Sequence, residues 1–411
     1  MDTHPPTTSV ARKDRGGKRV QPNPITSAIS VWIESLPPLT RHTLHPSVEQ
    51  LQAKAPKRWV VYPPMALLPS DSFDSEWTTL LSQCHVSRAD PHISRLCELI
   101  LKSIGRKEGK GTLTHLAMNA GIPLYEPSTR DDPSHNILRT PSGLHLLFGD
   151  FGPALSHADR PGERELQEAF WVSTKQNGIT QVWAPRYTMF SRGNIKEKTR
   201  LLHFHAHKPL PNTDLKQASA IDLYAGIGYF VFSYVKMGLG RVLGWELNPW
   251  SVEGLRRGAV ANGWSIKVVD TEEDLTSIVE TIVVFLEDNL LASKRLARLD
   301  LAESVMHVNC GLLPSSISSW QVALQVIGRN GWLHLHENVA LQNVPARRLE
   351  IEAILHQWLN ESKDTVSISH VELVKSYAPS VWHCVFDAQI IRVLVNDKSP
   401  ESRTPVCPTT R

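Results

Sequence analysis

Ile221-Asp222-Leu223-Tyr224-Ala225-Gly226-Ile227-Gly228-Tyr229-Phe230, residues 221–230, is the stretch that decides the fold. A short apolar run ends in an acid, glycines follow at alternate positions, and an apolar run of helical character continues from Val231. This order predicts a strand, a glycine-rich loop and a helix. Glycines let the backbone approach a ligand closely, and the start of a helix supplies N–H groups without partners. We therefore expect a ligand to bind at this loop.

A second strand and a carboxylate follow the loop. Residues 241–246 have the character of a strand that ends in Glu246, and Pro249 stands where the first turn of a helix tolerates proline. A carboxylate about twenty residues beyond a glycine loop is placed to accept hydrogen bonds from ribose hydroxyls. Gly226 and Glu246 are therefore candidate cofactor-binding residues, in a nucleoside-cofactor pocket at the carboxyl ends of two neighbouring parallel strands.

The loop pattern also bears on which cofactor is bound. A dinucleotide-binding loop needs a third small residue for helix–strand packing, and here Val231 takes that place. The order of one acid and two glycines from Asp222 to Gly228 is instead similar to the first motif of S-adenosylmethionine (SAM)-dependent transferases. The pattern favours SAM, and another doubly wound domain, such as a NAD-dependent oxidoreductase, is the alternative.

Composition sets wide limits on the partners. The chain has 411 residues, room for two domains, and a formal net charge of +3 that neither demands nor excludes a nucleic-acid partner. Its five cysteines show no metal-ligand spacing, so we expect reduced thiols in an intracellular, cytoplasmic protein. No apolar run is long enough to span a membrane and no apolar signal-peptide stretch begins the sequence, so we expect no membrane partner.

Changes in composition along the chain predict four segments. Residues 1–28 are expected to be a disordered basic arm, and residues 29–214 an N-terminal α+β domain and linker. Residues 215–395 are expected to form the SAM-binding catalytic domain, and 396–411 a flexible tail. The predicted fold class is α/β, a class I SAM-dependent transferase with a Rossmann-like doubly wound sheet and a smaller α+β N-terminal domain.

The linker segment 187–200 carries a cluster of cations. Ser191 is a plausible turn or N-cap hydroxyl, and Lys198 follows about two helical turns later, so both side chains can face one side. As charges alone, such clusters are more often a solvated face than a binding site. The alternating histidines of 203–207 are more typical of one face of an edge strand than of a metal site.

A third strand is expected over 281–289, and it ends in the polar pair Asp288 and Asn289. An Asp that accepts from an exocyclic amine, followed by a backbone N–H, is suited to reading adenine. A turn at the end of a strand is the simpler explanation, because Asp-Asn is common there. The chain between 262 and 288 is long, so the assignment of this pair is weaker than that of Glu246.

Three motifs occur in one order along residues 144–395. They are Met189-Phe190-Ser191-x-Gly193-Asn194-Ile195-x-Glu197-Lys198, the loop from Asp222 to Gly228, and Asn309-x-Gly311-Leu312-Leu313-Pro314-Ser315-Ser316. Supporting matches are His334-x-His336-Glu337-Asn338 and Ser376-Tyr377-Ala378-Pro379-Ser380. Together they resemble the wybutosine-synthesis aminocarboxypropyltransferase family, which is related to the tRNA guanine-37 N1-methyltransferases. Cys310 departs from the leucine that this family usually has.

The resemblance implies a reaction and a set of site residues. The family transfers the 3-amino-3-carboxypropyl group of SAM to C7 of 4-demethylwyosine at position 37 of tRNA(Phe) and releases 5′-methylthioadenosine. It implies that Ser191 and Lys198 contact the cofactor, that Glu246 holds the ribose, and that Asp288 with Asn289 holds the adenine. The anticodon loop of tRNA(Phe) is the implied partner and a monomer is expected. No catalytic residue is assigned, because proton loss restores aromaticity without a dedicated base, and no metal ligand is expected.

The rival function is the guanine-N1-methyltransferase of the same tRNA position. A fourth strand is expected over 304–309. Amine and ring-nitrogen methyltransferases tend to have Asn-Pro-Pro or Asn-Leu-Pro at the end of this strand, whereas this chain has the longer segment 309–316. A tRNA-binding protein without activity is a further alternative, and the intact Glu246 and loop glycines speak against it.

Overall fold

The computed structural model describes residues 23–38, 48–70, 72, 91–120, 141, 143–155, 159–207, 214–270, 275, 277–299, 301–359 and 364–393. The described residues fall into two compact units, one drawn from Met1–Asn119 and His145–Gly149 and the other from Ala120–Leu144 and Asp150–Arg411. Within the described part of the chain, no helix is both long enough and apolar enough to cross a membrane. The predicted tail 396–411 lies outside the described residues.

The first unit packs helices on a small sheet. Its helices are α1 (Pro24–Ser35), α3 (Val48–Ala53) and α5 (Pro91–Glu108), and its strands β1 (Val60–Tyr62), β2 (Met65–Leu68), β3 (His115–Met118) and β4 (His145–Phe148) pair in the order β1-β2-β3-β4. Asn23 caps α1 by accepting a hydrogen bond from the backbone N–H of Ile25. The final residues of the segment 1–28, expected as a disordered arm, are therefore helical, and 1–22 lie outside the described residues.

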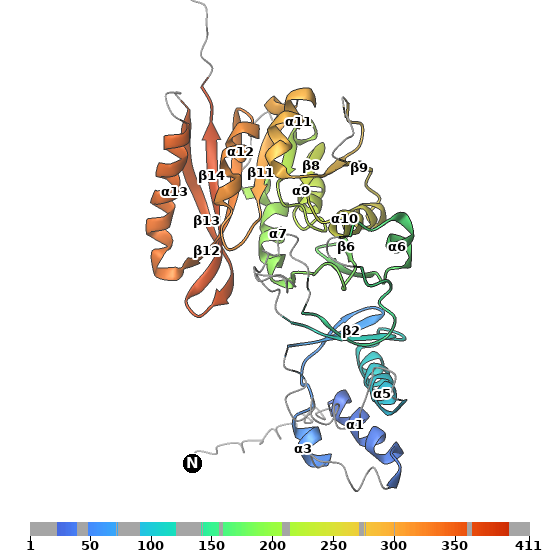
Figure 1. Ribbon diagram of the computed structural model, residues 1–411. Helices are drawn as coiled ribbons and strands as arrows, with labels where there is room; N and C mark the ends of the chain where they lie inside the picture. Colours follow the sequence, from blue (N-terminus) through green and yellow to red (C-terminus); the bar gives the residue numbers. More distant parts are fainter. Residues whose placement is uncertain are drawn as a thin grey trace, which may run out of the picture. The chain divides into compact units, whose positions relative to one another are not determined.

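The second unit is built on an eight-stranded mixed sheet (Figure 1). The strand order is β13-β14-β12-β11-β7-β8-β10-β9. The strands are β7 (Ser219–Asp222), β8 (Arg241–Trp245), β9 (Ile266–Asp270), β10 (Ile282–Leu286), β11 (Val305–Cys310), β12 (Asn330–Ala340), β13 (Thr365–Ala378) and β14 (Val381–Ile391). Six neighbouring strands, in the spatial order β12-β11-β7-β8-β10-β9, are parallel. The strand β14 pairs antiparallel with both β12 and β13.

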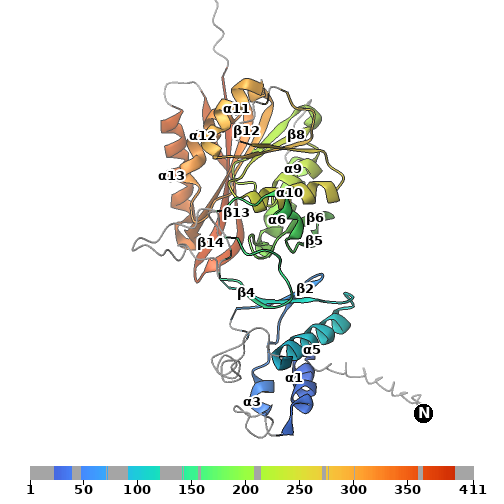
Figure 2. The same cartoon turned by 45° about the vertical axis from the view of Figure 1, so that its right-hand side comes forward.

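Helices cover both faces of this sheet (Figures 1 and 2). One face packs against α11 (Ala292–Leu299), α12 (Trp320–Val326) and α13 (Val344–Trp358), and the other against α7 (Ile195–Leu202), α9 (Val231–Met237) and α10 (Pro249–Ala261). The remaining short elements are α6 (Glu163–Glu168), α8 (Phe204–His207) and the hairpin β5 (Val172–Gln176) and β6 (Ile179–Trp183). The predicted α/β fold with a doubly wound, Rossmann-like sheet is confirmed.

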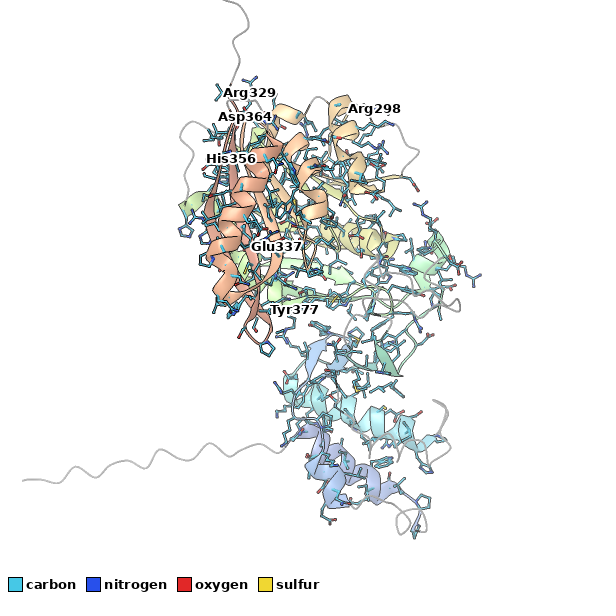
Figure 3. All side chains as sticks on the ribbon, turned by 60° about the vertical axis from the view of Figure 1, so that its left-hand side comes forward. Arg298, Arg329, Glu337, His356, Asp364 and Tyr377 are labelled. Carbon is cyan, nitrogen blue, oxygen red and sulfur yellow. The ribbon has the colours of Figure 1, made fainter. Side chains whose placement is uncertain are left out.

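Alternation along a strand sends neighbouring residues to opposite faces of the sheet. Figure 3 labels Glu337 on β12, and its carboxylate Oε2 accepts a hydrogen bond from Nε of Arg347 on α13 at 2.7 Å. His336 lies on the opposite face, where its ring packs against Phe230. Tyr377, near the tip of the β13–β14 hairpin, is 62% exposed.

Two local expectations differ from the structure. The histidines of 203–207 lie at the end of α7 and in α8 rather than on an edge strand, because Phe204 packs its ring against His307 and Trp332 of the sheet. The segment after Asn262, for which no strand is predicted, forms β9, an edge strand parallel to β10.

Candidate active site

The glycine loop and Glu246 meet at the carboxyl ends of β7 and β8. The Oε2 atom of Glu246 accepts a hydrogen bond from the backbone N–H of Gly226 at 2.9 Å, and its Oε1 accepts one from the N–H of Asn248 at 2.9 Å. Burial raises the pKa of this carboxyl above its ordinary value, while the backbone donors oppose the rise. Each oxygen keeps a second lone pair, so the carboxylate can still accept from the two hydroxyls of a ribose.

The loop conformation requires its glycines. Gly226 and Gly228 have φ angles of +53° and +87°, in the region that side chains disfavour. A Cβ on Gly228 would lie 2.6 Å from Cζ of Phe232, and one on Gly226 would lie 3.0 Å from the ring of Tyr229. Both positions therefore require glycine, because the ring of Phe232 packs against Gly228 and that of Tyr229 against Gly226.

Asp222, the acid of the loop motif, is fully buried. Its Oδ1 accepts hydrogen bonds from the Tyr224 N–H at 3.2 Å and from Nδ2 of Asn309 at 3.0 Å. Burial raises the pKa of Asp222 to about 7, against the opposing effect of hydrogen bonds from Asn309 and from the backbone N–H groups of Tyr224 and Val231. Because the carboxyl is 0% exposed, it holds the glycine loop and the start of α9 in place.

Asp288 and Asn289 begin the turn after β10. The Asp288 side chain accepts from the Leu290 N–H at 2.8 Å, as the cap of a short helical turn, and the residue is exposed. Asn289 donates from Nδ2 to the carbonyl of Leu223 at 2.8 Å. That bond brings Asn289 to the end of β7 although β8 intervenes in the sheet. Asn289 thus joins the Gly226–Glu246 pair, whereas the Asp288 side chain also has the capping role that its position after a strand suggested.

Lys198 is buried and bound by amides. Its Nζ donates to Oε1 of Gln176 at 2.7 Å and to Oε1 of Gln181 at 2.9 Å, and it lies 5.0 Å from the ring centroid of Phe190 and 5.8 Å from that of Tyr229. Burial lowers the pKa of Lys198 to about 8. Lys198 therefore reaches the glycine loop through Tyr229, and a direct contact with a cofactor stays a prediction.

Ser191 lies close to the same tyrosine. The Tyr229 hydroxyl donates to the carbonyl of Met189 and accepts from the Ser191 N–H at 3.2 Å. The Ser191 hydroxyl accepts from Nζ of Lys375, on β13, at 3.3 Å. Ser191 and Lys198 thus both lie close to Tyr229.

A polar row on β11, β12 and β14 was not assigned from the sequence. Nε2 of His336 lies 3.1 Å from Oδ1 of Asn309, and Nδ1 of His336 lies 2.9 Å from Nε2 of His383. Asn338, paired with His383 across the strands, has both amide atoms buried without partners. The motifs around His336 and Ser376 flank these positions in the sequence, but no spacing links residues so far apart in the chain.

Three aromatic residues near the loop, Tyr224, Tyr229 and Trp245, differ in their exposure to solvent. Trp245 is fully buried and stacks on Phe285 with ring centroids 4.6 Å apart, so it belongs to the core. Tyr224 and Tyr229 are partly exposed beside the loop. In the described residues, no group of three or more histidines, cysteines or acids could hold a metal ion.

Fold and site together define a class I SAM-dependent transferase, in which a glycine-rich loop and an acid meet at the carboxyl ends of two neighbouring parallel strands. No family model matches the chain. Curated relatives do match it. It is 40% identical over 352 residues to tRNA wybutosine-synthesizing protein 2 of Schizosaccharomyces pombe, covering 85% of this chain and 76% of the relative. It is 33% identical to the protein of the same name in Saccharomyces cerevisiae, covering 82% of this chain and 74% of the relative.

The chain belongs to the tRNA wybutosine-synthesizing protein 2 family. Among solved structures, TYW2 of Pyrococcus horikoshii in complex with MeSAdo superposes with a TM-score of 0.54 at 16% identity, over 90% of this chain and all of that one. That likeness supports the fold. The predicted family is therefore confirmed, as is its class of enzyme.

Proposed function

We propose that the protein transfers the 3-amino-3-carboxypropyl group of SAM to C7 of 4-demethylwyosine at position 37 of tRNA(Phe), releasing 5′-methylthioadenosine in wybutosine biosynthesis. The observation that carries this proposal is the family membership, at 40% identity across 85% of the chain. The Gly226–Glu246 pair supplies the matching cofactor site. The guanine-N1-methyltransferase reading is not favoured, because the relatives above carry the wybutosine name.

Different residues hold different parts of the donor, SAM. Glu246 accepts from the ribose hydroxyls, and Asn289, with Asp288 beside it, faces the adenine. Ser191 and Lys198, which both lie close to Tyr229, contact the cofactor as well. SAM supplies a sulfonium with three electrophilic carbons, and the carbon held in line with the nucleophile is the one that reacts. The site must therefore fix the amino-acid arm, since a free arm would leave the methyl group equally exposed.

The tRNA base requires a surface on which to stack, but it requires no dedicated base residue of the protein. A base of the anticodon loop has to leave its stack to reach the donor, and partly exposed aromatic rings such as Tyr224 provide a surface for it. C7 loses its proton after the new bond has formed, which restores aromaticity, so no dedicated base is assigned. The same proposal includes action as a monomer in the cytoplasm.

Transfer of labelled SAM tests the function directly. The substrate is tRNA(Phe) that carries 4-demethylwyosine, taken from cells that lack this protein. Label in the carboxypropyl carbons is expected to enter the tRNA, and label in the methyl group is expected to leave as 5′-methylthioadenosine. Methyl label in the tRNA, with S-adenosylhomocysteine as the by-product, would instead establish a methyltransferase. Light scattering during size-exclusion chromatography tests whether the protein is a monomer.

A further inference from the structure

The strands β12 and β14 project beyond the carboxyl end of their neighbour. The last residue of β11, Cys310, pairs with Leu335, so β12 continues past it from His336 to Ala340. In open α/β sheets, ligands bind outside the carboxyl ends of the strands. The projecting pair of strands therefore stands beside the glycine loop, at the edge where a ligand of this fold lies.

The projecting strands carry polar side chains on one face. Residues paired directly across strands share a face, so Asn338 and His383 lie on the same side. His336 shares that side because it is two residues from Asn338. Lys375 of β13 pairs with His383 and continues the row. This side of the sheet faces α7 and α9, and hence Ser191 and Tyr229.

The hydrogen bonds fix which nitrogen of His383 carries the proton. The amide Nδ2 of Asn309 must face the Asp222 carboxyl, because it donates to Oδ1 there. Oδ1 of Asn309 therefore accepts from Nε2 of His336. Burial lowers the pKa of both histidines, that of His383 to about 4, so both are neutral near pH 7.

A neutral ring that donates from one nitrogen accepts at the other. Nδ1 of His336 consequently accepts from Nε2 of His383, 2.9 Å away. The other nitrogen of His383, Nδ1, is left as an acceptor, and it is buried without a hydrogen-bond partner in the described structure. His383 is 1% exposed, so water does not compete freely for this lone pair.

Lys375 supplies a positive charge next to this acceptor. Its Nζ donates to the Ser191 hydroxyl at 3.3 Å, and among the described residues no carboxylate lies within ion-pair distance of it. Its side chain crosses the backbone of Gly193 so closely that a Cβ there would lie 2.4 Å from Cδ of Lys375. Gly193 of the predicted linker motif thus leaves room for a lysine that has no anion of its own.

From these contacts we propose that Lys375 and His383, with Asn338 beside them, bind the amino-acid end of the SAM arm. The carboxylate of the arm pairs with Nζ of Lys375, and its ammonium donates to Nδ1 of His383. A cation and a neutral acceptor side by side are complementary to a zwitterionic α-amino acid. Held at that end, the arm is stretched away from the adenosine and its γ-carbon is presented to the base. This inference rests on the proposed function and names the subsite behind its choice of carbon.

Calorimetric binding without tRNA tests the subsite. Two ligands are titrated, namely SAM and 5′-methylthioadenosine, which lacks the arm. Lys375→Gln is expected to weaken SAM about 10- to 100-fold, as the loss of a charge-assisted bond does, and to leave 5′-methylthioadenosine within about twofold. Lys196→Gln is the matched control, because Lys196 is an exposed cation that pairs with Glu372, and it should change neither affinity.

Two substitutions of His383 separate its two nitrogens. Glutamine places its amide where Nε2 lies and keeps a donor for His336, but it provides no acceptor at Nδ1. Asparagine places an acceptor near Nδ1. His383→Gln is therefore expected to weaken SAM selectively, and His383→Asn to restore part of the loss. Decarboxylated SAM should bind Lys375→Gln as tightly as it binds the unmodified protein, since it has no carboxylate to lose.

Three outcomes would overturn the inference. Equal losses for SAM and 5′-methylthioadenosine would place Lys375 at the adenosine. Unchanged SAM affinity would remove the subsite. Unchanged SAM affinity together with weaker, less salt-dependent tRNA binding would assign Lys375 to a phosphate of the tRNA. Failure of the unmodified protein to bind either ligand would instead refute the proposed function, so the two proposals fail in distinguishable ways.

Discussion

Glu246 and Gly226 are joined by a hydrogen bond of 2.9 Å between the side-chain Oε2 and the backbone N–H. The bond connects the end of β8 to the glycine-rich turn after β7. Together with the bond from the Asn248 N–H, it fixes the orientation of the carboxylate. The carboxylate proposed to accept from the ribose is thus held in place before a ligand binds, which reduces the entropic cost of binding.

Glu246→Gln is expected to weaken SAM about 10- to 100-fold, because the amide replaces one charged acceptor and directs N–H groups at a backbone N–H. Both SAM and 5′-methylthioadenosine should lose affinity, since both carry the ribose. Calorimetric titration of the two ligands measures this. Glu280→Gln, an acid of the loop before β10, is the control. Retention of full affinity for both ligands would remove Glu246 from the site.

Asp222→Asn is expected to change how stability depends on pH. Burial raises the pKa of Asp222 to about 7 from its ordinary value of 3.8, so the folded protein holds this proton over a range in which the unfolded chain has lost it. The stability that this proton contributes is present below pH 4 and is lost as pH rises towards 7. Relative to Asp222→Asn, the unmodified protein should lose on the order of 4 kcal/mol across that window. Urea unfolding at intervals of pH measures the difference, and parallel curves would contradict the assignment.

Lys198→Met should show the opposite slope at higher pH. Burial lowers the pKa of Lys198 to about 8 from 10.5, so between these values the unfolded chain holds a proton that the folded protein has released. Stability of the unmodified protein should therefore rise through this window relative to Lys198→Met, by on the order of 3 kcal/mol. Lys236→Met, with its amine at the surface, controls for the loss of a lysine.

Asp387→Asn is expected to destabilise the protein strongly. Asp387 is fully buried, and its carboxylate pairs with both terminal nitrogens of Arg200, at 2.6 and 2.9 Å, and with Nδ1 of His334 at 2.7 Å. Breaking a buried ion pair by removing one partner costs about 3–5 kcal/mol. Urea unfolding should report a loss of that size.

The matched comparison for Asp387 is an ion pair at the surface. Arg164 and Glu168 pair on α6 with exposed side chains, so Arg164→Gln should leave the unfolding midpoint where it was. A double-mutant cycle with Arg200→Met then isolates the coupling between Arg200 and Asp387. A coupling energy near zero would mean that the pair does not join α7 to β14.

The parts of the site that lie close together in sequence could be predicted from the sequence. The acid, the glycines and Glu246 are local to one β-α-β unit, and parallel strands bring their carboxyl ends to one edge without further information. The position of Asn289 relative to the loop could not be predicted, because the sequence does not show where in the sheet the extra strand β9 lies. Its contact with Leu223 depends on tertiary packing.

Lys375 and His383 could not be found in this way. Lys375 meets Ser191 across 184 positions of sequence, through a hairpin whose register is set by bulges in β13. The histidines of 203–207 show the opposite difficulty. Five residues of alternating polarity match a strand and a short helix equally well, and the packing of Phe204 decided for the helix.

The position of β14 sets when this molecule can be completed during synthesis. Although β14 is the last strand along the described residues, it lies inside the sheet, between β12 and β13. During synthesis, the glycine loop is made well before β14, the strand with which β13 pairs. A polypeptide that ended before residue 381 would contain the glycine loop, but it would lack Asp387, which pairs with Arg200, and His383, whose Nε2 lies 2.9 Å from Nδ1 of His336.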